Sequence, residues 1–365
     1  MTTEQLDGEV RALIAAERPD GRRSYRVVQW ATGNIGGRAL RAVIQHPDMV
    51  LAGVYVHSPE KAGRDAGELC GLDDIGVTAT RDIDEIVALG ADCVIYAPLA
   101  TDLDELCLLL ASGANVVTTR TDFHRAGSLD PEIRARVEEA CRRGGTSIHS
   151  TGSSPGFVTE ALPLVLTSIQ RTLDGLTIEE SADLSHRDSP DLLFEVMGFG
   201  RPPAEYNERR VSALQDSFGP SLHLVADALS IRLDSIQSIG EVATARRRVQ
   251  IAAGTLEPGT VAAQRVTVSG LQDGRPVLRF RATWYCTADL EPAWTVHATG
   301  WHISVDGDAP LDVDIRFAVP LERIAAVSPS YTANRAVNAV PFVCEASPGI
   351  RSTVDLPPIV AMLGT

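Results

Sequence analysis

The stretch Tyr25-Arg26-Val27-Val28-Gln29-Trp30-Ala31-Thr32-Gly33-Asn34-Ile35-Gly36-Gly37-Arg38-Ala39-Leu40 decides the fold of this chain. It is typical of a buried strand, a glycine turn and the first turn of a helix. In α/β proteins such a unit holds a pyrophosphate, because the glycines let the backbone approach the ligand and the helix N-terminus supplies N–H donors and a positive dipole end. The stretch therefore predicts a nucleotide site at Gly33, Asn34, Ile35 and Gly36.

The strict G-x-G-x-x-G pattern is incomplete here, because its three glycine positions are occupied by Ala31, Gly33 and Gly36. Alanine at the first position is acceptable, since a tight turn needs a small residue there. The motif alone is weak evidence, but it follows a strand, opens a helix and begins a series of strand–helix units. A glycine turn that binds no ligand is the alternative.

Apolar strands alternate with amphipathic helices after this turn. Strands are predicted at residues 25–31, 49–57, 91–97, 115–119 and 146–150, and helices at 36–45, 82–89, 102–111 and 131–143. We expect Asp82 to cap its helix and Pro131 to occupy a first helical turn. Near-continuous apolar strands separated by helices indicate a parallel sheet covered on both faces. This predicts a Rossmann-type doubly wound α/β domain over residues 24–155, preceded by an arm at 1–23.

The second half of the chain has a different pattern, with β-branched and aromatic segments divided by turn signals such as Glu257-Pro258-Gly259. It predicts an antiparallel meander, so residues 156–330 are expected to form an α+β domain on a mainly antiparallel sheet. Helices are expected at about 204–215 and 222–229. A last helix is expected at 331–339, and residues 331–365 are expected to pack back on the Rossmann domain.

Composition excludes several classes of function. The net charge of −15 repels nucleic acid and anionic membranes. Six scattered cysteines show no metal-ligand spacing and no disulfide framework, which favours a reducing cytoplasm and predicts no metal. No apolar run is long enough to span a membrane. We therefore expect a cytoplasmic protein with a small-molecule partner and no nucleic-acid or membrane partner.

The loop after the second strand distinguishes NAD from NADP. An NAD site usually places Asp or Glu at the end of that strand, but this chain reads Val56-His57-Ser58-Pro59-Glu60-Lys61-Ala62-Gly63-Arg64. Ser58 offers a hydroxyl, and Lys61 and Arg64 offer cations for a 2′-phosphate. Lys61 is also the only lysine in the chain. The loop predicts NADP (NADPH), although Glu60 is a contrary signal and a solvated surface lysine is the alternative.

The other cofactor contacts follow from the topology, because ligands lie beyond the carboxyl ends of parallel strands. This places Ala97, Pro98 and Thr119 along the dinucleotide. Gly152 and Pro155, in the turn after the strand at 146–150, are expected at the nicotinamide end. An ordinary loop in which Ser154 caps a helix starting at Pro155 is compatible with the same residues.

Several stretches of this chain match one known family. They are VVQWATGNIG (27–36), HSPEKAGRDAGELCG (57–71), GANVVTTRTDF (113–123), STGSSPGF (150–157), MGFGRPP (197–203), IAAGTLEPGTVA (251–262) and AVNAVPFVCEASPGI (336–350). With them the chain resembles the dihydrodipicolinate reductase-like N-terminal-domain proteins, which are related to 2,4-diaminopentanoate dehydrogenase and to NAD(P)H-dependent native amine dehydrogenases. The resemblance implies an NADP-type Rossmann domain, an α+β second domain and a homodimer.

Two departures from the relatives matter. Dihydrodipicolinate reductase carries a His-His-x-x-Lys-type motif for its substrate, and nothing like it occurs here, so that activity is rejected. The amine dehydrogenases place a glutamate just after the strand that matches residues 115–119. This chain reads Arg120-Thr121-Asp122 there, and Asp122 is expected to stand in for the glutamate.

Reductive amination needs a carboxylate near the substrate nitrogen to relay protons. Asp122 and Glu160 are the catalytic candidates, and Phe157, Met197 and Phe199 are expected to line an apolar substrate pocket. We therefore predict an NADP-dependent oxidoreductase of the amine dehydrogenase type, acting on a small, fairly apolar ketone, aldehyde or amine. The alternatives are a reductase of a carbonyl or C=C bond without ammonia, and a non-catalytic NADP-binding sensor.

Overall fold

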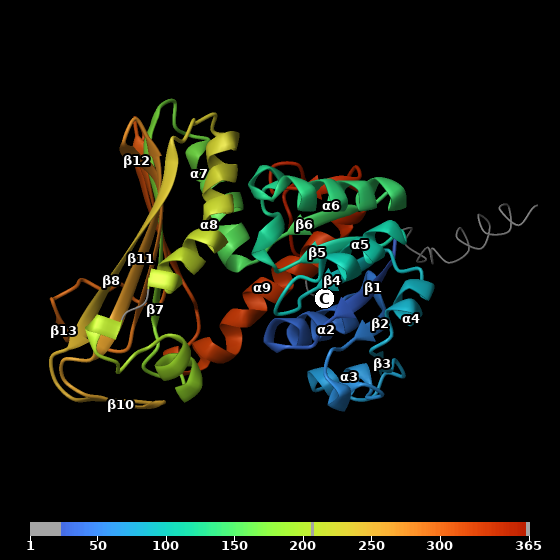
Figure 1. The fold of residues 1–365 in the computed structure, drawn as a ribbon, viewed down its shortest axis with the longest axis horizontal. Helices are drawn as coiled ribbons and strands as arrows, with labels where there is room; N and C mark the ends of the chain where they lie inside the picture. Colours follow the sequence, from blue (N-terminus) through green and yellow to red (C-terminus); the bar gives the residue numbers. More distant parts are fainter. Residues whose placement is uncertain (1–22, 206–207, 363–365) are drawn as a thin grey trace, which may run out of the picture. The chain divides into compact units, whose positions relative to one another are not determined.

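The chain forms two compact units in a computed structural model that describes residues 23–205 and 208–362 (Figure 1). The first unit comprises the described residues up to Ser153 together with those from Pro329 onward, and the second unit is Ser154–Ser328. The arm predicted at 1–23 lies outside the described residues except for Arg23. Within the described residues, no helix is both long enough and apolar enough to cross a membrane.

The first unit is built on a seven-stranded sheet of order β16-β6-β5-β4-β1-β2-β3. All its strand pairs are parallel. The strands are β1 (Tyr25–Trp30), β2 (Met49–Tyr55), β3 (Ala79–Thr80), β4 (Cys93–Tyr96), β5 (Asn115–Thr118), β6 (Ser147–Ser150) and β16 (Gly349–Arg351). This order confirms the predicted Rossmann-type sheet, and β16 is a strand that the sequence pattern did not predict.

Helices cover both faces of this sheet (Figure 1). One face packs on α4 (Ile83–Ala88), α5 (Leu103–Ala111) and α6 (Pro131–Gly144), and the other on α2 (Asn34–Gln45) and the later part of α9 (Leu321–Cys344). Strand β1 alternates accordingly, with Val28 in the first cluster and Val27 in the second. Burial on both sides explains why apolar residues predominate in β1, β2 and β4.

Aspartates begin four helices of the first unit. Asp82, Asp102 and Asp130 accept hydrogen bonds from backbone N–H groups at the starts of α4, α5 and α6, and Asp65 does so for α3 (Ala66–Cys70). The predicted cap at Asp82 is confirmed, and Pro131 is the first residue of α6 as expected. Short side chains with an acceptor oxygen satisfy the free N–H groups of a helix start.

The structure corrects the bounds of the helices that were predicted in the second half of the chain, and both observed helices contain proline. The helix expected at 331–339 is the longer α9, which continues through Pro329 and Pro341. The two helices expected at 204–215 and 222–229 are one helix, α8 (Glu208–Ala228), with Pro220 inside it. A proline inside a helix costs roughly 3 kcal/mol. Both helices bury an apolar face, which offsets that cost.

The second unit contains a seven-stranded sheet of order β13-β8-β11-β12-β7-β14-β15. Its strands are β7 (Leu173–Asp183), β8 (Ser235–Ala245), β11 (Val261–Gln272), β12 (Arg275–Tyr285), β13 (Leu290–Glu291), β14 (Gly300–Gly307) and β15 (Leu311–Arg316). The sheet is mainly antiparallel, as predicted, but the simple meander is wrong. Strand β7 inserts between β12 and β14 and pairs in parallel with β12.

Helix α8 lies along one face of this sheet (Figure 1). Its Phe218, Leu222 and Val225 pack on buried residues of the central strands, among them Ile178 and Phe280. Phe218 and Phe280 are stacked with ring centroids 3.8 Å apart. Between Ser153 and Leu256 this part of the chain also contains η4 (Ser153–Ala161), α7 (Leu162–Thr167), η5 (Asp191–Val196) and η6 (Pro203–Glu205). The strands β9 (Val249–Ile251) and β10 (Gly254–Leu256) form a small separate sheet.

Candidate cofactor and active site

The glycine turn links β1 to α2 at the carboxyl edge of the parallel sheet. Ala31 adopts φ 69°, in the left-handed region, and its N–H donates to Tyr55 O at 2.9 Å. This position corresponds to the first glycine of the fingerprint, so the backbone conformation, and not only small size, is the reason that glycine is favoured there. Gly33 then caps α2 in an extended conformation.

Gly33 and Gly36 have different reasons to be glycine. A Cβ on Gly36 would lie 2.1 Å from Ala31 O, so the close approach of helix and strand requires glycine there. A Cβ on Gly33 would meet no heavy atom within 4 Å. Gly33 therefore borders open space beside the turn, which fits the place that the fingerprint reserves for a pyrophosphate.

The N-terminus of α2 has the electrostatic character of an anion site. It has no side-chain cap and no acid in its first turn. In contrast, α3, α4, α5 and α6 are each capped by an aspartate. The N–H groups of Asn34 and Ile35 belong to this uncapped first turn, where the positive dipole end favours negative charge.

Gln29 supports the turn and was not predicted as a site residue. Its side chain is fully buried within β1, and Nε2 donates to Ala31 O at 2.9 Å and to Trp30 O at 3.2 Å. An amide side chain between the apolar residues Val28 and Trp30 is the sequence signal that would have indicated it.

Ser58, Lys61 and Arg64 were expected to bind the cofactor from the loop after β2. Of these three, Lys61 reaches the glycine turn. Lys61 Nζ donates to Thr32 O at 2.9 Å and to Thr32 Oγ1 at 3.2 Å. Ser58 instead donates to the Glu60 carboxylate, and this hydrogen bond lowers the pKa of Glu60. Arg64 forms an ion pair with Glu68 at 2.6 Å.

The loops after β4 and β5 meet around Asp122. Arg120 Nε lies 3.3 Å from Asp122 Oδ2, and Thr101 Oγ1 donates to the same oxygen at 2.9 Å. Arg120 Nη1 also donates to Leu99 O at 2.8 Å, so Arg120 joins the two loops. Its role was not predicted. Asp122 is therefore a partly exposed carboxylate at the carboxyl edge of the sheet, the same edge as the glycine turn.

The residues expected along the dinucleotide lie at this edge as well. Ala97 and Pro98 follow β4 and are half-buried, and Ala97 N donates to Trp30 O at 3.1 Å. Thr119 follows β5 and is half-buried, and Gly152 follows β6 and is buried. Beside Gly152, the Thr151 hydroxyl is buried without a hydrogen-bond partner among the residues that the structure describes.

Glu160 and Pro155 belong to the second unit. Glu160 is fully buried, and the Ser221 hydroxyl donates to its Oε1 at 2.8 Å. Thr159 Oγ1 lies 2.7 Å from Ser221 Oγ and accepts from Gly156 N at 2.9 Å. This chain of hydrogen bonds connects the carboxyl group to the backbone just after Pro155.

The interpretation of Ser154 as a helix cap is wrong. Ser154, Pro155 and Gly156 have non-helical backbone angles, so no helix starts at Pro155. The Ser154 hydroxyl is buried and has no hydrogen-bond partner among the described residues.

The three expected pocket residues also lie in the second unit, in different environments. Phe157 is partly buried and its ring centroid lies 6.3 Å from that of Trp301. Phe199 is a fully buried core residue, and Met197 packs on the same cluster. The Met197 carbonyl accepts from the Gln264 side chain.

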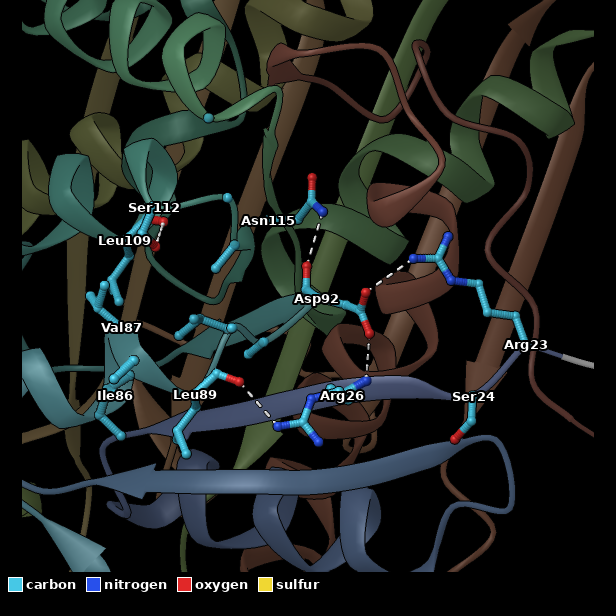
Figure 2. Close-up of a pocket in the computed structure, with 17 residues that line it drawn as sticks. Arg23, Ser24, Arg26, Ile86, Val87, Leu89, Asp92, Leu109, Ser112 and Asn115 are labelled. Carbon is cyan, nitrogen blue, oxygen red and sulfur yellow. Dashed lines mark hydrogen bonds and ion pairs between the residues drawn. The ribbon is translucent and has the colours of Figure 1, made fainter. Parts of the chain in front are cut away.

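A cavity of about 480 Å³ opens at the opposite, amino edge of the parallel sheet (Figure 2). Asp92 lines this cavity and accepts from Arg23 Nη2 at 3.0 Å and from the backbone N–H of Arg26 at 2.8 Å. Arg26 Nη2 donates to Leu89 O at 3.0 Å. Ligands of open α/β sheets bind at the carboxyl edge, so this cavity is separate from the candidate cofactor site.

Two family models match the chain, one over each part. The model described as dihydrodipicolinate reductase, N-terminus, matches residues 27–148. The model described as 2,4-diaminopentanoate dehydrogenase C-terminal domain matches residues 157–365, which is more than half of the chain.

Individual relatives agree with these matches. An amine dehydrogenase from Streptomyces virginiae is 31% identical over 353 residues, covering 92% of this chain and 98% of the relative. The 2,4-diaminopentanoate dehydrogenase from Acetoanaerobium sticklandii is 22% identical, covering 80% of each chain. The solved amine dehydrogenase from Mycobacterium smegmatis shares the fold, with a TM-score of 0.73 at 21% identity over 93% of this chain and 97% of that one. The chain therefore belongs to the dehydrogenase family that includes amine dehydrogenase and 2,4-diaminopentanoate dehydrogenase.

Proposed function

We propose that this protein is an NADP-dependent amine dehydrogenase. It would interconvert a small, fairly apolar ketone or aldehyde plus ammonia with the corresponding primary amine. The relatives named amine dehydrogenase and 2,4-diaminopentanoate dehydrogenase support action on a carbon–nitrogen bond. The single observation that carries the proposal is the Asp122 carboxylate, which Arg120 and Thr101 hold at the sheet edge that also bears the glycine turn.

The residues around the turn suit a nicotinamide dinucleotide. Gly33, Asn34, Ile35 and Gly36 would hold its pyrophosphate, and Ala97, Pro98, Thr119 and Gly152 would border the rest of it. When bound, the cofactor donates or accepts the hydride.

NADP is favoured over NAD by the end of β2, where Val56 and His57 follow in place of an acid. Ser58 and Arg64 would bind the 2′-phosphate, and both would then exchange their present partners, Glu60 and Glu68, for phosphate oxygens. Comparing the affinities of NADPH and NADH tests this part of the proposal, since a preference for NADH would contradict it.

Asp122 would act on the substrate nitrogen. In the direction of amination, ammonia adds to the carbonyl carbon, water then leaves, and the resulting iminium accepts a hydride. The carboxylate would accept a proton from the added nitrogen and return one to the departing hydroxyl. Both of its contacts within the described residues fall on Oδ2. Oδ1 would therefore face the substrate while Arg120 and Thr101 fix the orientation of the carboxyl group.

Glu160 is the second candidate for the catalytic carboxylate. Phe157 is the first candidate for an apolar wall of the substrate pocket. Ser221 donates to the Glu160 carboxyl group, and Thr159 links Ser221 to the backbone N–H of Gly156. These bonds would fix the position of the Glu160 side chain.

The family resemblance further supports a homodimer, which light scattering on the purified chain would test.

The deciding experiment measures NADPH consumption with a panel of small apolar ketones and aldehydes, with and without ammonia. Turnover that depends on ammonia is expected. Turnover without ammonia would indicate a carbonyl or C=C reductase, and tight NADPH binding without any turnover would indicate a sensor.

Asp122→Asn tests the assigned residue. We expect kcat to fall by roughly 10²- to 10⁴-fold, the usual contribution of a positioned acid–base group, while NADPH affinity is retained. Asp104→Asn is the matched control, because Asp104 is an exposed carboxylate of the same unit that pairs with Arg136. Unchanged amination by Asp122→Asn would remove Asp122 from the mechanism.

A further inference from the structure

The only lysine of the chain does not extend into solvent but reaches back to the glycine turn. Lys61 ends the short 3-10 helix η1 (Pro59–Lys61), and its side chain is half-buried. Its Nζ bonds both the carbonyl oxygen and the hydroxyl of Thr32, 29 residues earlier. Thr32 immediately precedes Gly33, so the ammonium lies at the start of the turn that faces open space.

The electrostatic situation of this ammonium is unusual. Both of its partners are neutral oxygens, and within the described residues it has no carboxylate partner. A partly buried charge without a counter-ion is unfavourable. The Lys61 ammonium has three N–H donors, and the two bonds to Thr32 use two of them. One donor and the full positive charge are left for an anion.

Ser58 and Arg64 are placed differently. Ser58 bonds Glu60 within its own loop, and Arg64 pairs with Glu68 on α3. Within the described residues neither side chain is hydrogen-bonded to the glycine turn, so the three residues do not converge on one point. Of these three residues, Lys61 is the one whose side chain is hydrogen-bonded to the turn in the described part of the chain.

We propose that Lys61 is a ligand of the cofactor's pyrophosphate and not of a 2′-phosphate. The inference rests on the proposed nicotinamide cofactor. The pyrophosphate is common to NAD and NADP, so Lys61 sets the affinity for both and does not select between them. Selection between the two cofactors then depends on Ser58 and Arg64.

Titration of Lys61→Gln with NADH, NADPH and ADP-ribose tests the inference. A charge-assisted contact predicts that all three dissociation constants rise by a similar factor, about 10- to 100-fold, with the NADPH/NADH ratio unchanged. Lys61→Arg retains the charge and is expected to recover most of the loss. Arg64→Gln is the comparison variant, since it is expected to weaken NADPH alone.

Two results would overturn the inference. A loss confined to NADPH would make Lys61 a 2′-phosphate ligand, and unchanged affinity for all three nucleotides would make it a structural tie to Thr32. Circular dichroism and the unfolding midpoint of each variant separate a binding loss from a folding loss.

Chemical labelling tests the same point on the unmodified protein. The chain has a single lysine side chain, so an N-hydroxysuccinimide acetate ester labels only Lys61 and the α-amino group, and peptide mass spectrometry resolves the two. ADP-ribose is expected to protect Lys61, whereas adenosine 2′-monophosphate, which lacks a pyrophosphate, is not. Protection by the monophosphate alone, or by neither, contradicts the inference.

Failure of this inference and failure of the proposed function give different results. Ammonia-dependent turnover with unchanged nucleotide binding by Lys61→Gln would preserve the function and reject the lysine's role. Protection of Lys61 by ADP-ribose without any turnover would preserve the lysine's role and reject the function.

Discussion

Alanine at Gly36 should destabilise the fold, whereas alanine at Gly33 should leave stability almost unchanged, although the two glycines are three residues apart in one turn. A Cβ on Gly36 would lie 2.1 Å from Ala31 O and 3.0 Å from Gln29 Nε2. Ala31 O is a backbone atom in a left-handed turn, and Gln29 is fully buried, so neither neighbour moves easily. The turn or the start of α2 must therefore shift.

The cost of Gly36→Ala follows from that clash. Overpacking of a tightly packed site costs typically 1–3 kcal/mol, and contact with backbone places this substitution at the upper end, about 2–3 kcal/mol. For a unit of this size, such a loss lowers the midpoint of thermal unfolding by about 5–10 °C. Cofactor affinity should fall as well, because the displaced turn no longer presents its N–H groups.

Gly33→Ala should leave stability almost unchanged. Its backbone has φ −72°, which alanine adopts without strain, and its Cβ would meet nothing within 4 Å. Alanine is a poorer helix N-cap than glycine, but it restricts the unfolded chain by about 0.4–1 kcal/mol, so the two effects nearly cancel. The Cβ would occupy the space proposed for the pyrophosphate, and nucleotide affinity should fall at least about tenfold.

Urea denaturation together with ADP-ribose titration of both variants provides the assay. A Gly36→Ala protein as stable as the parent chain would show that the close approach of α2 to β1 is not as described. A Gly33→Ala protein that binds ADP-ribose normally would refute the placement of the pyrophosphate beside this turn.

Two further substitutions test the structure around the site. Asp65 accepts from the N–H groups of Ile75, Gly67 and Gly76, and these bonds lower its pKa. Its contribution to stability is therefore complete above pH about 4 and is lost as the pH falls through the lowered folded pKa. Urea unfolding at several pH values should show the difference between the parent chain and Asp65→Asn shrinking in acid, and a constant difference would argue against these bonds. Ser221→Ala removes a hydrogen bond from the buried Glu160 carboxyl and should cost about 1–3 kcal/mol in urea unfolding at neutral pH, whereas no loss would mean that the bond is weak.

Features that depend on neighbouring residues were predictable from the sequence. The glycine turn, the cap at Asp82 and the start of α6 at Pro131 each involve residues within one helical turn of one another. The alternation of apolar strands and helices likewise indicated a parallel sheet, because a strand covered on both faces needs apolar side chains in both directions. These local rules were sufficient for the fold class.

Features that depend on distant residues were not predictable in this way. The full lengths of α8 and α9 were not predicted, because the packing of their apolar faces outweighs the local cost of the prolines inside them. The parallel pairing of β7 with β12 joins strands about a hundred residues apart, and nothing in either strand specifies the direction of its partner. Arg120 was read as part of a motif, whereas its bonds to Leu99 and Asp122 join two loops.

The sequence by itself determined the turn at Ala31–Gly36, the parallel sheet behind it and the family to which the chain is similar, because a strand, a turn and a helix are encoded within sixteen consecutive residues. Only the tertiary structure decided what surrounds that turn. It separated the role of Gly36, which packs on Ala31, from that of Gly33, which faces open space. It also placed Lys61 against Thr32, because the parallel pairing of β1 with β2 brings the two loops to one edge of the sheet.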